Sequence, residues 1–164
     1  MNLAKLFSGG KSAVAPGVTL KSSGSTAQLL VSRELAGPLT VPLKQEPLRG
    51  PGQHAFTVRM PQKGVRTAVG FVEQPRAEYL TPDYAGSKGY ASFGGAGFIY
   101  PAKSMSKQTY GEGDSVECVL CFDTRRVTFS VNGRLAGSTP YPYATGYPAI
   151  SVFPGDLRCE IAFE

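Results

Sequence analysis

The stretch SVECVLCFDTRRVTFSVNG, residues 115–133, carries the clearest structural signal in the chain. Apolar side chains occupy every second position of residues 116–122 and again of residues 127–131, which is typical of strands with one buried face. The polar segment 123–126 between them predicts a turn, and Asn132-Gly133 is the strongest short signal for a second one. The stretch therefore predicts an antiparallel meander.

The rest of the chain repeats this organisation of short strands and turns. Similar alternation occurs at His54–Met60, Val65–Val72 and Leu157–Phe163. The 20 glycines and 13 prolines among 164 residues leave little room for long helices. About ten strands can be placed, with turn signals at the roughly 8–12-residue spacing of β-sandwiches. We predict an all-β fold, an antiparallel two-sheet β-sandwich with little or no helix, in which residues 17–164 form one domain and residues 1–16 a loose N-terminal arm.

The predicted core also accounts for the residue types that could carry chemistry. It comprises Phe56, Val58, Val69, Phe71, Cys118, Leu120, Phe129, Ile150 and Ile161. The single histidine, His54, alternates in register with Phe56, so we expect it to pack or to end a strand. Cys118 and Cys121 are three apart in a strand and point to opposite faces, so they cannot share a zinc ion. We therefore predict no catalytic site, no metal and no cofactor.

The charges are basic in balance but dispersed. The chain has 17 Lys and Arg against 12 Asp and Glu, a formal net charge of +5, without a long run of one sign. Most of these charges are expected to form a solvated surface, and the alternative is a patch for an acidic partner. Nucleic acid is not an expected partner, because the strand aromatics alternate with polar residues as core positions do.

The cellular location is predicted from two missing signals. Three cysteines do not make the disulfide framework of a secreted protein. No window approaches the ~18 apolar residues of a transmembrane helix. We expect an intracellular protein of the cytoplasm with no membrane partner, and a cytoskeletal or mitochondrial location is the alternative. The sequence indicates no oligomeric state.

Two loops are rich in tyrosine. Residues 73–89 contain Tyr79 and Tyr84, and residues 138–146 contain Tyr141 and Tyr143. Tyrosine is enriched at protein interfaces, because its ring buries apolar area while its hydroxyl finds a partner. These side chains are predicted either to contact a partner or to pin long loops to the sandwich.

The run from Tyr110 to Gly133 resembles the signature of the SPRY domain, in which Gly-Asp opens a strand that ends in an acidic turn and a strand ending in Asn-Gly follows. Four further segments fall in the order expected of that family: Gly52-Gln-His54, Val69-Gly-Phe71, Tyr147-Pro-Ala-Ile-Ser151 and Cys159-Glu160. The resemblance extends from about Gly17 to the C-terminus. Two features depart from it: the tryptophans usual near Phe93 and Phe98 are absent, and the closing Asn-Phe-Gly is replaced by Ala162-Phe163-Glu164.

The resemblance implies a bent β-sandwich without known catalysis, whose loops at one end bind peptides or proteins. The positions that match the family's peptide pocket are Tyr84, Val152, Phe153 and Gly155. Lys44 and Arg49 are added from charge alone, and Tyr141 and Tyr143 from their loop. We predict a non-catalytic interaction module that binds a protein or peptide, with an acidic one as a candidate. The alternative is a structural subunit of a larger cytoskeletal or organellar assembly.

Overall fold

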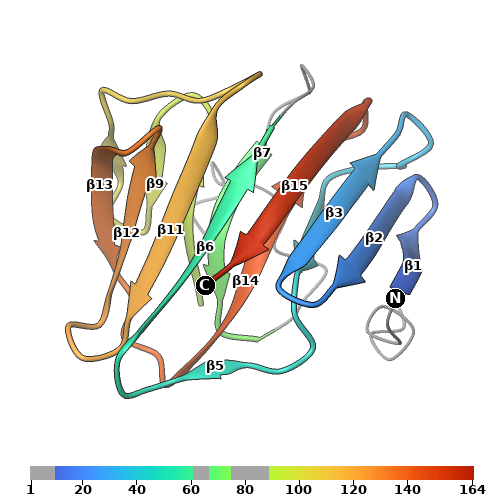
Figure 1. The fold of residues 1–164 in the computed structure, drawn as a ribbon. Coiled ribbons are helices and arrows are strands. Elements are labelled where there is room, and N and C mark those ends of the chain that lie inside the picture. Colours follow the sequence, from blue (N-terminus) through green and yellow to red (C-terminus); the bar gives the residue numbers. More distant parts are fainter. Residues whose placement is uncertain (1–9, 61–66, 75–88) are drawn as a thin grey trace.

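The computed structural model describes residues 10–60, 67–74 and 89–164. Within these ranges the regular structure consists of β-strands, and no helix is present that could span a membrane. Its strands form two antiparallel sheets that pack face to face (Figure 1). The eight-stranded sheet runs in the order β1 (Gly10–Ala15), β2 (Val18–Ser23), β3 (Thr26–Val31), β15 (Leu157–Phe163), β6 (Gln53–Arg59), β11 (Ser115–Cys121), β12 (Arg126–Val131), β13 (Arg134–Pro140). The seven-stranded sheet runs in the order β10 (Ser104–Met105), β9 (Phe98–Tyr100), β8 (Tyr90–Gly94), β7 (Thr67–Val72), β14 (Thr145–Val152), β4 (Leu39–Pro42), with β5 (Leu48–Arg49) paired to β14. The predicted two-sheet sandwich is confirmed.

The predicted meander is formed by β11, β12 and β13. Cys118 of β11 lies opposite Phe129 of β12. The other alternating apolar residues of these two strands also lie opposite one another, on the inner face of the sheet. The described part of the predicted N-terminal arm is a strand rather than a loose segment. β1 pairs with β2 from Gly10 opposite Ser22 to Ala15 opposite Val18, so the backbone groups of β2 find partners on both sides.

The core lies between the two sheets, where aromatic rings from both inner faces meet. All nine predicted core residues are buried, with at most 2% of each exposed. The ring of Phe56 meets that of Phe71 edge-on, with centroids 5.2 Å apart. The rings of Phe93 and Phe129 lie 5.4 Å apart. Such pairs contribute about 0.5–1.5 kcal/mol beyond their buried area.

The outer face of the seven-stranded sheet is also buried along β4, β7 and β8, although it carries polar residues. The hydroxyls of Thr40 and Ser151 lie 2.8 Å apart, and Ser151 also bonds the hydroxyl of Tyr90. Burial raises the pKa of Tyr90 well above its ordinary value, so its hydroxyl keeps its proton. All residues of β7 and β8 are accordingly buried, and polar residues at alternate positions do not mark a solvated face here.

Replacement of a ring at the centre of the core tests this packing. We expect Phe129→Ala to lower the free energy of unfolding by about 3–5 kcal/mol, because the cavity left between the sheets cannot collapse fully. Urea melts of the purified protein measure this loss. Ser130→Ala, on the outward face of the same strand, should change stability by less than about 0.5 kcal/mol. A loss below about 1 kcal/mol for Phe129→Ala would contradict the packing described here.

Candidate functional site

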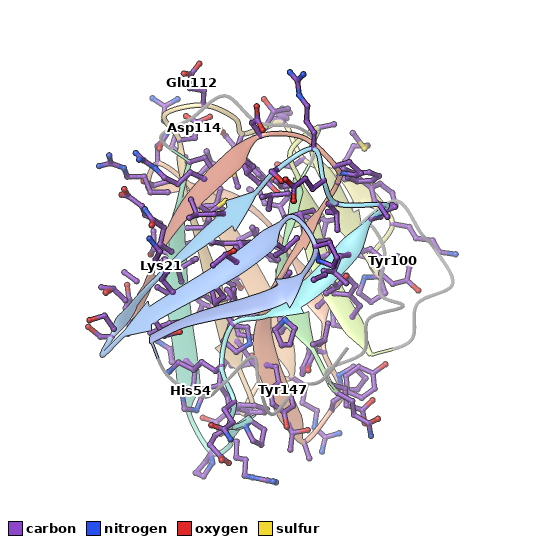
Figure 2. The ribbon with its side chains drawn as sticks, turned by 90° about the vertical axis from the view of Figure 1, so that its right-hand side faces the viewer. Lys21, His54, Tyr100, Glu112, Asp114 and Tyr147 are labelled. Atoms are coloured by element: carbon purple, nitrogen blue, oxygen red, sulfur yellow. The ribbon has the colours of Figure 1, made fainter. Side chains whose placement is uncertain are left out.

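Loops gather at two opposite ends of the sandwich. The upper end in Figure 1 is formed by Ser32–Leu35, Gly111–Asp114 and Phe153–Asp156, and the lower end by Arg49–Gly52, Phe122–Arg125 and Tyr141–Ala144. Figure 2 shows Glu112 and Asp114 at the upper end and His54 and Tyr147 at the lower end. β14 runs from one end to the other, so at about 3.3 Å per residue the ends are about 23 Å apart.

The residues predicted to bind a partner are divided between these ends. Val152, Phe153 and Gly155 lie at the end of β14 that reaches the upper end, whereas Arg49, Tyr141 and Tyr143 lie at the lower end. Lys44 lies toward the lower end, with its Nζ 4.5 Å from the centroid of the Phe163 ring. Tyr84 lies outside the described residues, as does Tyr79. The predicted set is therefore not one cluster.

At the upper end, only part of the predicted set reaches the surface. The side chain of Val152 is fully buried in the core between the sheets. Phe153 is half-buried directly after β14, at a strand end as predicted. Gly155 has a φ of 142°, a backbone conformation that favours glycine, and its N–H donates to the carbonyl oxygen of Ser32 at 3.3 Å. Gly155 is buried, as is Val152, so of the described residues predicted at this end only Phe153 remains a predicted partner contact at the surface.

At the lower end, three loops surround a hollow of about 500 Å³, which we call the lower-end hollow. It contains two of the predicted residues, Arg49 and Tyr143. Its lining is Arg49, Gly50, Pro51, Phe122, Asp123, Arg125, Pro142, Tyr143 and Ala144. These residues come from three distant parts of the sequence, so the sandwich alone brings them together.

The first two loops are joined by contacts beside Phe122. The N–H of Phe122 donates to the carbonyl oxygen of Gly52 at 2.9 Å, and the N–H of Gly52 donates to Oδ1 of Asp123 at 3.2 Å. A Cβ atom at Gly50 would lie 2.8 Å from the Cβ of Phe122, so only glycine allows this approach. The neighbouring Arg49 is held by β5, where it pairs with Thr145 of β14.

The third loop is fixed to the core through its two tyrosines. Tyr141 is 1% exposed, and its hydroxyl donates to the carbonyl oxygen of Thr145 at 2.8 Å. Its predicted place on the binding surface is therefore wrong, because its ring packs inside the sandwich. The half-buried ring of Tyr143 stands edge-on against that of Tyr141, with centroids 5.0 Å apart. Tyr143 thus forms a wall of the hollow that rests directly on the core.

Glu73 and Gly89, the described residues that flank the long loop after β7, are held at the same end. The hydroxyl of Tyr143 accepts the N–H of Gly89 at 3.0 Å, and the hydroxyl of Thr145 donates to the carbonyl oxygen of Glu73 at 3.3 Å. Glu73 and Gly89 are themselves joined by a backbone bond of 2.7 Å. Tyr143 therefore pins a loop, as one of the two interpretations predicted, and also lines the hollow.

His54 supports the hollow from the neighbouring strand. Its Nε2 donates to the carbonyl oxygen of Arg49 at 2.9 Å, and its ring stands edge-on to that of Phe122, with centroids 5.8 Å apart. This is the packed strand-end histidine that the alternation predicted. Phe122 and Arg125 were not predicted as site residues, although the polar turn at 123–126 marked where the loop begins.

The lining of the hollow combines positive charge with apolar surface. Two guanidinium groups, two aromatic rings and two prolines offer charge and apolar surface, but none is a nucleophile paired with a base. Over the ranges that the structure describes, no three His, Cys, Asp or Glu side chains are placed to hold a metal ion. The arrangement places two positive charges beside apolar ring surface.

Comparison with known proteins identifies the fold. No model of a protein family matches the sequence, and no curated protein matches it. The SPRY domain of human HERC1 is similar in structure, with a TM-score of 0.55 and 15% sequence identity over 93% of this chain and 91% of that one. A human SPRY domain gives a TM-score of 0.60 and 19% identity over 87% of this chain and 94% of that one. The chain therefore has a SPRY-like fold, and the resemblance seen in the sequence is confirmed at the level of structure.

The thiol of Cys121, next in sequence to Phe122, provides a chemical test of this turn. The side chain and backbone of Thr124 donate hydrogen bonds to Cys121 and lower the pKa of its thiol, whereas burial raises the pKa of Cys159 to about 12. A lower pKa leaves more thiolate at neutral pH, so Cys121 should be the cysteine that iodoacetamide alkylates first.

We expect Thr124→Val to raise the pKa of Cys121 and to move the midpoint of its alkylation profile to higher pH. The rates are measured by mass spectrometry of the intact protein over a pH series. Thr128→Val, on the adjacent strand, should leave the midpoint in place. Equal midpoints for Thr124→Val and the unmodified protein would rule out the hydrogen bond from the Thr124 hydroxyl.

Proposed function

We propose that this SPRY-like sandwich is a non-catalytic protein-interaction module that binds a segment of a partner protein in the lower-end hollow. The observation that carries the proposal is the meeting of three loops around one hollow lined by arginine and aromatic side chains. Aromatic residues and arginine are the types that dominate the energy of protein interfaces. The resemblance to SPRY domains, whose loops at one end bind peptides or proteins, supports the same function.

The size of the hollow supports this proposal. Its volume of about 500 Å³ falls within the range of roughly 300–1,000 Å³ that is typical of ligand sites. It accommodates a few side chains of an extended segment. A stable protein complex buries about 800 Å² on each partner, so the hollow would be the anchor of a wider interface.

The walls of the hollow are supported from behind. Phe122 is backed by His54 and Gly50, and Tyr143 rests on the buried ring of Tyr141. A wall that is already fixed loses little conformational freedom when a partner binds, which favours affinity.

A second candidate function is the structural subunit, and a second hollow favours it. This hollow, of about 550 Å³, lies on the outer face of the eight-stranded sheet, where β2, β3, β15 and β6 run side by side. Lys21, Arg59 and Glu160 are among its lining residues, and Lys21 is labelled in Figure 2. Two separate hollows on one small domain are what a subunit held by several neighbours would need.

Filling one hollow at a time separates the two functions. Ala144 and Ser22 are both exposed, and each lines one hollow. We expect Ala144→Trp to lose the partners that the unmodified protein captures from cell extract, because the indole occupies the lower-end hollow. Ser22→Trp should retain them. The measurement is mass spectrometry of the captured proteins, after circular dichroism has shown that both variants are folded.

The opposite result would refute the proposal. If Ala144→Trp retains the partners and Ser22→Trp loses them, the outer face of the eight-stranded sheet is the binding surface and the structural subunit is the better account.

A further inference from the structure

We infer that the lower-end hollow selects a segment that carries an acidic side chain, whose carboxylate is held by Arg49 and Arg125. This inference rests on the proposed function and names the chemistry of the partner. The segment also presents an apolar side chain to Phe122 and Tyr143.

Neither arginine of the hollow forms an ion pair with a described residue, unlike the three arginines that pair with Asp156 or Glu160. Ion pairs join Arg33 to Asp156 at 4.0 Å, and both Arg59 and Arg158 to Glu160 at 3.6 and 3.9 Å. Arg126 instead donates to the hydroxyl of Ser138 at 2.8 Å. Within the described ranges, neither Arg49 nor Arg125 makes an ion pair, and both line the same hollow.

The one carboxylate in the lining does not neutralise them. Oδ1 of Asp123 accepts the N–H of Gly52 at 3.2 Å, so this carboxylate fixes the backbone of the loop. Two positive charges against one negative charge leave the lining basic. An arginine can bind a carboxylate through two parallel hydrogen bonds, which are stronger than bonds between neutral groups.

Both guanidinium groups extend from fixed backbone positions. The carbonyl oxygen of Arg49 accepts a hydrogen bond from His54, and β5 pairs Arg49 with Thr145. Arg125 has a φ of 55°, and its carbonyl oxygen accepts the N–H of Tyr141 at 2.8 Å. The backbones that carry the charges are thus fastened to the core, and only the side chains must be ordered by a ligand.

The remaining walls are apolar and set the second requirement. Phe122 and Tyr143 offer ring surface, and Pro51 and Pro142 carry no backbone N–H that could bind an anion. A ligand that offered only charged groups would leave this apolar surface in contact with water. An apolar side chain beside the carboxylate would remove this ring and proline surface from water, which favours binding.

The test uses immobilised peptide pools and purified protein. Each pool holds nonapeptides whose central residue is Glu, Gln, phosphoserine or Lys, with flanking positions drawn from Leu, Val, Ala, Pro and Ser. We expect the Glu pool to retain more protein than the Gln and Lys pools. The double variant Arg49→Gln with Arg125→Gln should reduce the preference for Glu over Gln about tenfold. Arg134→Gln, at an exposed arginine of β13 outside this lining, is the matched control and should leave the preference unchanged.

Three results would overturn the inference. Equal retention of Glu and Gln pools would remove the need for a carboxylate. Retention of the phosphoserine pool alone would assign the arginines to phosphate. An unchanged preference in the double arginine variant, with binding still blocked by Ala144→Trp, would leave the proposed function standing without this chemistry. Failure of Ala144→Trp to block the Glu pool would instead refute the proposed site itself.

Discussion

Aromatic packing between the two inner faces is the constraint on which the rest of the molecule depends. Phe93 meets Phe129 and Phe56 meets Phe71 across the core, and these pairs fix how far apart the sheets lie and how they are oriented. The position of every strand end follows from that arrangement. The three loops of the lower-end hollow leave strands of both sheets, so their separation is set by the core more than by contacts among the loops.

The sequence predicted well which residues of a strand face the core, but it predicted poorly which end of the sandwich each loop reaches. Alternation in β11 and β12 placed Cys118, Leu120 and Phe129 in the core, because the side-chain period of a strand has only two outcomes. The same period does not show which loops share an end of the sandwich. Antiparallel strands reverse direction at each turn, so the end that a loop reaches depends on how many strands precede it. Arg49 and Phe153 were therefore predicted together but lie about 26 Å apart along β14. The two-residue strand β5 that places Arg49 is too short to show any alternation.

The residues that line the hollow show a second limit of sequence patterns. Phe122 continues the alternation that predicts a buried face for residues 116–122, but it comes after the last residue of β11 and is only half-buried. Tyr141 and Tyr143 occupy similar positions in the sequence YPY, yet one is inside the sandwich and the other forms a wall. Tyr141 bonds Thr145, four residues further on, whereas Tyr143 bonds Gly89, which is far away in the sequence, and the alternation of residues reveals neither contact.

The burial of Tyr141 also bears on how fast a partner could bind. The hydrogen bond of its hydroxyl and the contact between its ring and that of Tyr143 fix the loop of residues 141–144 to the core. That wall of the hollow is therefore a rigid part of the domain. Binding there would need no slow ordering of the loop, and a partner would meet a surface already in its bound shape. Association would then proceed at a rate set by collision and orientation. Partners that differ in affinity would differ mainly in how long they stay, because residence time is where most variation among related complexes arises.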